Sequence, residues 1–165
     1  MGESDDRLQG RIIELLPKMR RFARTLTHHV DDADDLVQLA LERALTHWEQ
    51  WQEGTRLDSW LYRIVKNAWI DELRVRGRRR NVVDDIDLAE SVPDPGGDAS
   101  DSLSVEQAMA LLPEEQRLAV ALVLVEGLPY KEAAQITGVP MGTLTSRLAR
   151  GRETLQRLLG SGEST

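Results

Sequence analysis

The sequence predicts an all-α fold made of two small helical domains joined by a flexible acidic linker. Apolar residues recur at steps of three and four positions along most of the chain, which is the period of an amphipathic helix. Alternation of apolar and polar residues, which marks half-buried strands, is absent. A polar stretch rich in proline, glycine and acidic residues separates the two helical parts. We therefore expect a first domain over residues 1–80, a linker over 81–103 and a second domain over 104–165.

The net charge of -7 is concentrated in the linker. Residues 1–80 hold 15 basic and 14 acidic side chains, residues 81–103 hold 7 acidic and no basic ones, and residues 104–165 hold 6 basic and 7 acidic ones. A strongly acidic domain would be repelled by nucleic acid. Because each helical part is close to neutral, its own charge does not exclude binding to DNA.

The apolar pattern of the first domain predicts three helices. The first carries an apolar stripe over residues 12–26, and Pro17 is expected to kink or restart it because proline has no backbone N–H to donate. The second carries a stripe that begins at residue 36 and ends near residue 51. Asp31 or Asp32 is the expected N-cap of this second helix.

The third helix of this domain mixes aromatic and cationic side chains. It is expected to run from Trp60 to about Val75, with Asp58 or Ser59 as its cap. Unpaired bases stack on aromatic rings while lysine and arginine follow the phosphate backbone, so this mixture suits single-stranded nucleic acid. The contributing side chains are Trp60, Tyr62, Arg63, Lys66, Asn67, Trp69, Arg74 and Arg76. Most of the rings are expected in the core, and Trp51, beside a glycine loop, is the one expected to face a base.

The second domain is predicted to contain four helices. Their expected ranges are residues 105–112, 114–126, 129–136 and 140–159. Pro113 suits the start of the second of them, and Gly127 suits its end because glycine adopts the left-handed conformation of a C-terminal cap. Gly138 occupies the turn between the last two helices.

The last two helices have the pattern of a helix-turn-helix, in which the second helix enters the major groove of DNA. Its expected packing side consists of Met141, Leu144, Leu148 and Leu155. The opposite side carries Ser146 and Arg150, and a guanidinium can form a forked pair of bonds with a guanine edge. Tyr130, Arg147 and Arg152 are placed to hold phosphates. The alternative is that these arginines form only the solvated side of an amphipathic helix.

The sequence holds no residues that indicate catalysis or a cofactor. Cysteine is absent, and no Ser/His/Asp set, phosphate loop or dinucleotide fingerprint occurs, so we expect neither an enzyme nor a bound cofactor. The acidic run at residues 31–35 lacks calcium-type spacing and favours helix capping over a metal site. The longest apolar stretch, residues 118–125, is far short of the ~20 residues of a membrane span. With no secretory signal at the N-terminus, a soluble cytoplasmic protein is expected.

Three stretches resemble successive motifs of the extracytoplasmic-function sigma factors of the sigma-70 superfamily. They are DDADDLVQLALERAL, EGTRLDSWLYRIVKNAWIDELRVRGRR and LPEEQRLAVALVLVEGLPYKEAAQITGVPMGTLTSRLARGRETL. The resemblance runs from about residue 12 to residue 159 and is interrupted only by the linker. It implies a factor that binds core RNA polymerase and directs promoter-specific transcription initiation, in response to stress and under the control of an anti-sigma factor.

The resemblance also implies a role for each helical part. The helix matching residues 34–45 would dock on the clamp helices of the polymerase β′ subunit, and its candidate contacts are Asp35, Leu36 and Gln38. The loop and helix matching residues 52–76 would engage the unwound −10 element. Its candidate residues are Trp51, Lys66, Asn67, Asp71 and Arg74. The helix matching residues 140–152 would read the duplex −35 element of promoter DNA. The candidate residues there are Tyr130, Thr143, Thr145, Ser146, Arg147, Arg150 and Arg152.

The last helix departs from the family pattern at two positions. Thr145 stands where members often have arginine or lysine, and Ala149 where they often have a larger residue. Base reading would then rest on Ser146 and Arg150, so the promoter sequence stays open. Two other functions are open as well, a decoy that binds an anti-sigma protein without DNA and a free-standing helix-turn-helix regulator. The retained arginines argue against the first, and the unexplained first domain argues against the second.

Overall fold

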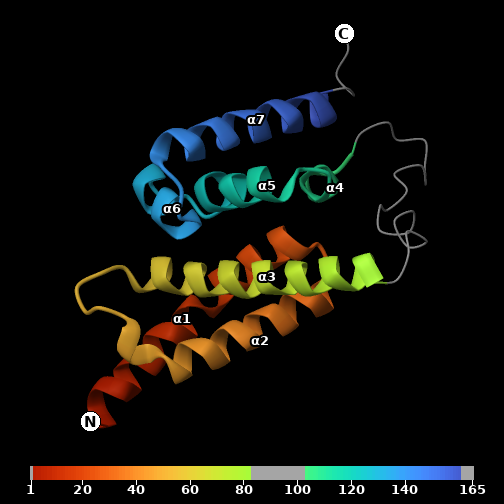
Figure 1. The fold of residues 1–165 in the computed structure, drawn as a ribbon. Coiled ribbons are helices and arrows are strands. Elements are labelled where there is room, and N and C mark those ends of the chain that lie inside the picture. Colours follow the sequence, from red (N-terminus) through yellow and green to blue (C-terminus); the bar gives the residue numbers. More distant parts are fainter. Residues whose placement is uncertain (1, 83–102, 161–165) are drawn as a thin grey trace.

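A computed structural model describes residues 2–82 and 103–160, and within these ranges the regular structure is helical. The helices form two stacked groups, α1 to α3 and α4 to α7, which correspond to the two parts of the sequence (Figure 1). The predicted all-α class is therefore confirmed. Most of the predicted linker lies outside the described residues, and the domain boundaries stay a prediction.

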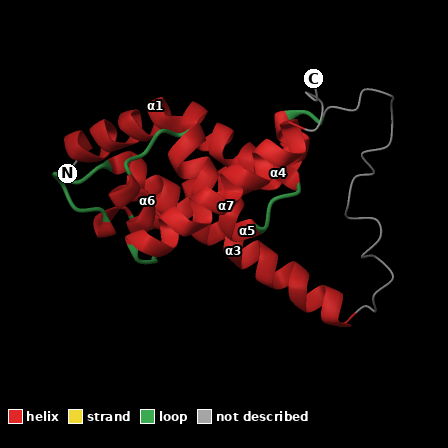
Figure 2. Ribbon diagram, turned by 90° about the horizontal axis from the view of Figure 1, so that it is seen from above, coloured by secondary structure: helices red, strands yellow, loops and turns green. Residues whose placement is uncertain are grey.

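The first group consists of α1 (Gly2–Thr27), α2 (Val30–Thr46), the short 3-10 helix η1 (Trp48–Gln50) and α3 (Leu57–Val82). The three long helices pack on one another around a common core. Phe22, on α1, is completely buried and meets the Tyr62 ring of α3 edge-on, with ring centroids 5.1 Å apart. The end of α3 projects beyond the rest of the molecule (Figure 2).

The ends and the middle of these helices differ from the sequence prediction. Pro17 lies inside an unbroken α1. His29 is the N-cap of α2 and makes no side-chain capping bond, so Asp31 and Asp32 lie in the first turn, where their charge favours the positive helix end. Asp58 and Ser59 lie inside the first turn of α3 rather than before it, since that helix begins at Leu57, three residues before its predicted start at Trp60.

The second group consists of α4 (Val105–Ala110), α5 (Glu114–Val120), a short π-helical stretch η3 (Ala121–Val125), α6 (Tyr130–Thr137) and α7 (Met141–Gly160). Ser104 caps α4 with a capping box, in which its hydroxyl accepts from the backbone of Gln107. Gly127 and Gly138 have φ of +71° and +72°, as their predicted positions after helix ends require.

The two groups contact each other directly. α3 packs against α6, and α1 packs against α4, α5 and η3. Arg117 of α5 lies at this junction, and its guanidinium donates to the carbonyls of Met109, Ala110 and Leu112 at the end of α4. It also donates to the carbonyl of Leu26 at the end of α1, at 3.0 Å. One positive charge therefore occupies the negative ends of two helices from different groups.

Candidate nucleic-acid interface

The packing side of α7 is fixed by close contact with the rest of the second group. Leu144 and Leu148 are 0% and 3% exposed. Gly151 is buried where α7 crosses α5, and an added Cβ there would lie 2.7 Å from a methyl of Val120. Met141, predicted on this side, is instead 48% exposed, because it is the first residue of the helix and extends past the neighbouring elements.

The opposite side of α7 borders an open recess. Ser146 and Arg150 are exposed there, and among the described residues Arg150 has no ion-pair partner. The recess has a volume of about 550 Å³ and is bounded on its other side by Pro113, Glu115 and Gln116. The predicted readers of duplex DNA are thus free to meet a ligand, whereas Leu144 and Leu148 hold the helix.

The remaining candidates for the −35 element differ in their exposure and in whether their side chains already have partners. Arg147 is partly buried and pairs with Glu115 at 3.5 Å, so its charge is already partly compensated. The Thr145 hydroxyl donates to the carbonyl of Gly142, and Thr143 is half-buried. Arg152 is exposed, as is Tyr130 at the start of α6.

The candidate −10 face of α3 makes more contacts within the protein than the outer face of α7 does. Asn67 and Arg74 are exposed, but Asp71 pairs with Arg43 of α2 at 3.1 Å. Lys66 is half-buried, and burial together with the nearby charge of Arg63 lowers the pKa of its amine.

Trp51 is not open to a base in this arrangement. Its ring is partly buried against the core of the first group and is covered by the guanidinium of Arg11, 5.2 Å from the ring centroid. Its indole Nε1 is buried without a hydrogen-bond partner. Trp48, in η1, is the more open ring at 42% exposed. Trp51 can therefore face a base, as predicted, only after the Arg11 guanidinium moves away from its ring.

The candidate polymerase contacts on α2 divide into two kinds. Asp35 and Gln38 are exposed, while Leu36 is 0% exposed. The burial of Leu36 contradicts its predicted direct contact with the polymerase. A wholly buried side chain holds α2 on the core and does not reach a partner. The apolar stripe that includes Leu36 was the signal for its burial.

The polar contacts between the two groups were not indicated by any pattern in the sequence. Ser59 donates to Glu132 at 3.0 Å, and Arg63 donates to the carbonyl of Gln135 at 3.1 Å. These partners are far apart in the chain, so periodicity along single helices does not reveal them.

The described residues contain neither a candidate membrane span nor a candidate metal cluster. No helix among them has the length and apolar character required to cross a membrane. No group of three or more metal-ligating side chains was found in the same part of the chain.

Comparisons with known proteins identify both helical groups. Residues 12–79 match the family model for Sigma-70 region 2, and residues 102–155 match that for Sigma-70, region 4. The ECF RNA polymerase sigma factor EcfG of Rhodopseudomonas palustris is 37% identical over 159 residues, which cover 93% of this chain and 86% of that protein. The ECF RNA polymerase sigma factor SigM of Mycobacterium tuberculosis is 34% identical over 143 residues, or 87% of this chain and 72% of that protein.

Solved structures give the same result. The structure of the sigma factor RpoE in complex with the anti-sigma factor NepR from Bartonella quintana matches with a TM-score of 0.80 and 32% identity, over 93% of this chain and 96% of that one. CnrH, in complex with the cytosolic domain of CnrY, shares the fold with a TM-score of 0.67 at 23% identity, over 99% and 92% of the two chains. Because both regions match in order and the similarity extends over nearly the whole chain, the protein belongs to the extracytoplasmic-function sigma factors of the sigma-70 family, which are transcription initiation factors and not enzymes.

Proposed function

We propose that the protein binds core RNA polymerase as a dissociable factor and directs it to a subset of promoters. In this function the second group reads the duplex −35 element through α7. The first group engages the unwound −10 element through α3, and it binds the clamp helices of the β′ subunit through Asp35 and Gln38 of α2.

The exposed face of α7 is the observation that supports this function most directly. Arg150 has no ion-pair partner among the described residues, and Ser146 lies one turn before it on the same side. A free guanidinium on the outer face of a helix-turn-helix can pair with both acceptors of a guanine edge in the major groove. Arg152 and Tyr130 are both exposed, and we assign them to phosphate contacts that would fix the position of the helix.

The first group supplies the complementary part of the interface. Asn67, Asp71 and Arg74 follow one another along the outer side of α3, and this mixture of amide, carboxylate and cation suits bases and backbone of an unpaired strand. A base captured on this face would offset the loss of its stacking in the duplex and so favour strand opening.

Control by an anti-sigma factor is part of the proposal. It is supported by the similarity, over both helical groups, to a sigma factor whose structure contains its anti-sigma partner. A factor of this class works where polymerase and genomic DNA are, and we therefore propose a cytoplasmic location.

The test is reconstitution of the protein with core RNA polymerase, followed by sequencing of the transcripts started from genomic DNA. The expected result is a set of start sites that share one −35 and one −10 sequence. If no promoter-specific transcript appears while an anti-sigma protein still binds, the proposal fails in favour of a decoy. If the protein binds duplex DNA alone and never associates with polymerase, it fails in favour of a free-standing regulator.

A further inference from the structure

The contact between the two helical groups centres on one buried carboxylate, that of Glu126. Its side chain is 0% exposed, although the residue lies at the end of η3 on the surface of the second group. Arg21 of α1 donates to both carboxylate oxygens, each at 2.9 Å. The Tyr62 hydroxyl of α3 donates to the same carboxylate at 2.6 Å. Glu126 thus joins α1 and α3 of the first group to the second group by three hydrogen bonds, two of them between charged partners.

The backbone around Glu126 has an unusual conformation. η3 is π-helical, and its last bond runs from the amide of Glu126 to the carbonyl of Ala121 at 2.9 Å. Gly127 follows with a positive φ of +71°. π-helical turns are rare and occur frequently at functional sites, because the extra residue changes the direction of the side chains that follow. Here the side chain that follows is the carboxylate that reaches the other group.

Weaker contacts surround this carboxylate and cover part of α3. The hydrogen bonds of Ser59 with Glu132 and of Arg63 with Gln135 lie along the contact of α3 with α6. Lys66, a −10 candidate one turn after Arg63, is half-buried in the same arrangement. We call this packing of the two groups on each other the closed arrangement. It uses a part of α3 that lies next to the predicted DNA face of that helix.

The closed arrangement also keeps the two DNA-reading helices too close together. α7 packs on α6, and α6 packs on α3, so two helix-packing steps of ~8–10 Å separate the axes of α7 and α3 by roughly 20 Å. At ~3.4 Å per base pair, roughly 20 Å corresponds to only about six base pairs of duplex, so the closed form can reach two DNA elements only when they are nearly adjacent. Elements that lie farther apart on the duplex are within reach of both helices only after the groups separate.

We propose that Glu126, with Arg21 and Tyr62, is a latch that holds the free protein in a closed form unable to occupy a whole promoter. The inference rests on the proposed function for the meaning of the closed form, but the latch itself is a property of the free chain. Separation of the groups exposes the carboxylate to water and leaves both of its partners intact, so the latch can open and close without unfolding either group.

The latch is tested by measuring the distance between the groups in solution. The chain has no cysteine, so Glu14→Cys on α1 and Gln156→Cys on α7 attach spin labels only at these two exposed positions. We expect one narrow distance distribution in the parent protein. Glu126→Gln keeps the shape but removes the charge, and Arg21→Ala removes the main donor. Each should increase the open population roughly tenfold or more, because hydrogen bonds to charged groups are about twice as strong as neutral ones.

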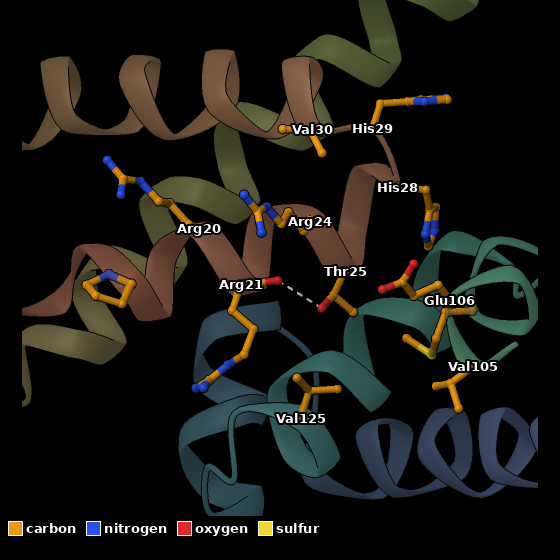
Figure 3. A pocket seen from close by; sticks show the side chains of 12 residues that line it. Arg20, Arg21, Arg24, Thr25, His28, His29, Val30, Val105, Glu106 and Val125 are labelled. Atoms are coloured by element: carbon orange, nitrogen blue, oxygen red, sulfur yellow. Dashed lines mark hydrogen bonds between the residues drawn. The ribbon is translucent and has the colours of Figure 1, made fainter.

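Arg20→Ala is the matched control. Arg20 is adjacent to Arg21 on α1 and is exposed, and its side chain points away from that of Arg21, although both residues line the same cavity of about 730 Å³ (Figure 3). It should leave the distance distribution unchanged. Tyr62→Phe keeps the ring contact with Phe22 and removes one bond, so it should open the protein less than Glu126→Gln. Identical distributions in all four variants and the parent would overturn the latch.

A second measurement tests what the latch controls. With limiting protein and saturating core polymerase, Glu126→Gln should raise the yield of transcript from a cognate promoter, while Arg20→Ala should not. Opening without any gain in transcription would overturn the autoinhibitory role. If the parent protein itself supports no promoter-specific transcription, the proposed function fails instead, and the distance measurement still decides the latch.

Discussion

The two helices proposed to contact the promoter, α7 and α3, differ in how much of their outer face is already in use. On α7, Ser146 and Arg150 border an open recess and have no described side-chain partner. On α3, Asp71 is paired with Arg43 and Lys66 is half-buried. The surface proposed to read duplex DNA is formed in the free protein, whereas the surface proposed for the unwound strand is partly engaged within the molecule.

This difference agrees with the physical states of the two targets. A duplex groove exists before the protein arrives, so a rigid, preformed helix face can bind it at once. An unpaired strand appears only when the duplex opens, so two of the residues proposed to contact it, Lys66 and Asp71, can be engaged within the free protein until then. The predictions below test this contrast, starting with the largest expected effect.

Arg150→Ala removes the free guanidinium of α7. We expect the preference for the cognate −35 duplex over a scrambled one to fall by ~1–3 kcal/mol, the usual loss when a forked base contact disappears. Fluorescence anisotropy with both duplexes measures it, and Arg157→Ala, near the other end of α7, is the control. An equal loss of affinity for both duplexes would assign Arg150 to a phosphate.

Gly151→Ala tests whether close packing orients the free face of α7. The added Cβ would lie 2.7 Å from Val120, and overpacking of ~1–3 kcal/mol should exceed the ~1 kcal/mol gained in helix propensity. A net loss of about 1 kcal/mol in the free energy of unfolding is expected by urea denaturation. Gly10→Ala, which meets nothing within 4 Å on α1, should instead stabilise. Equal effects of the two changes would show that the α5 contact does not constrain α7.

His28, in the turn between α1 and α2, makes the contact with the second group sensitive to acid. Its pKa is lowered to about 4 by burial, with contributions from the charges of Arg117 and His29. Between pH 6.5 and 4 the unfolded chain binds the proton that the folded one excludes, so the free energy of unfolding should fall as the pH falls through this window.

His28→Asn should reduce this slope in denaturation curves recorded at pH 7.5, 6 and 5. Asparagine tolerates the positive φ of 64° found at this position, so the substitution tests titration rather than backbone strain. A slope as steep as that of the parent protein would assign the acid sensitivity to other groups.

Arg43→Ala should have the smallest effect on stability. Its pair with Asp71 is 36% and 50% exposed at the two side chains, and surface pairs of this kind contribute about 0.2–1 kcal/mol. If Asp71 contacts the unwound strand, freeing it should strengthen binding to a single-stranded −10 oligonucleotide. Asp71→Asn in the same assay should not give this gain. Weaker binding of Arg43→Ala than of the parent would place Arg43 itself on the DNA.

Local sequence patterns were sufficient to predict the helices. They failed for features that tertiary contacts determine, such as a helix end or the continuity of a helix through a proline. The three- and four-residue periodicity predicted all the long helices, and Gly127 and Gly138 were predicted at helix ends that require a positive φ. Capping by Asp31 or Asp32 was wrong because α2 begins at Val30, before either aspartate, and its N-cap His29 makes no side-chain capping bond. Pro17 does not interrupt α1, since burial of its apolar stripe outweighs one missing bond.

The site shows the same division. The outer face of α7 follows from a helical wheel, because Leu144 and Leu148 determine which side is buried. The stacking of Arg11 on Trp51 and the contact of Arg21 with Glu126 do not follow from a helical wheel, because each contact joins residues from separate elements. Arg21 and Glu126 are 105 positions apart, and only the packed structure brings them together.

The fourfold bonding of Arg117 has a consequence for the speed of opening. Three of its four carbonyl partners belong to its own group, and only that of Leu26 belongs to the other. When the groups part, this guanidinium loses one bond and remains compensated by the end of α4. No charge is left unpaired in an apolar environment, and no helix has to melt. We therefore expect separation on the microsecond-to-millisecond timescale of domain motions rather than on the slower timescale of unfolding.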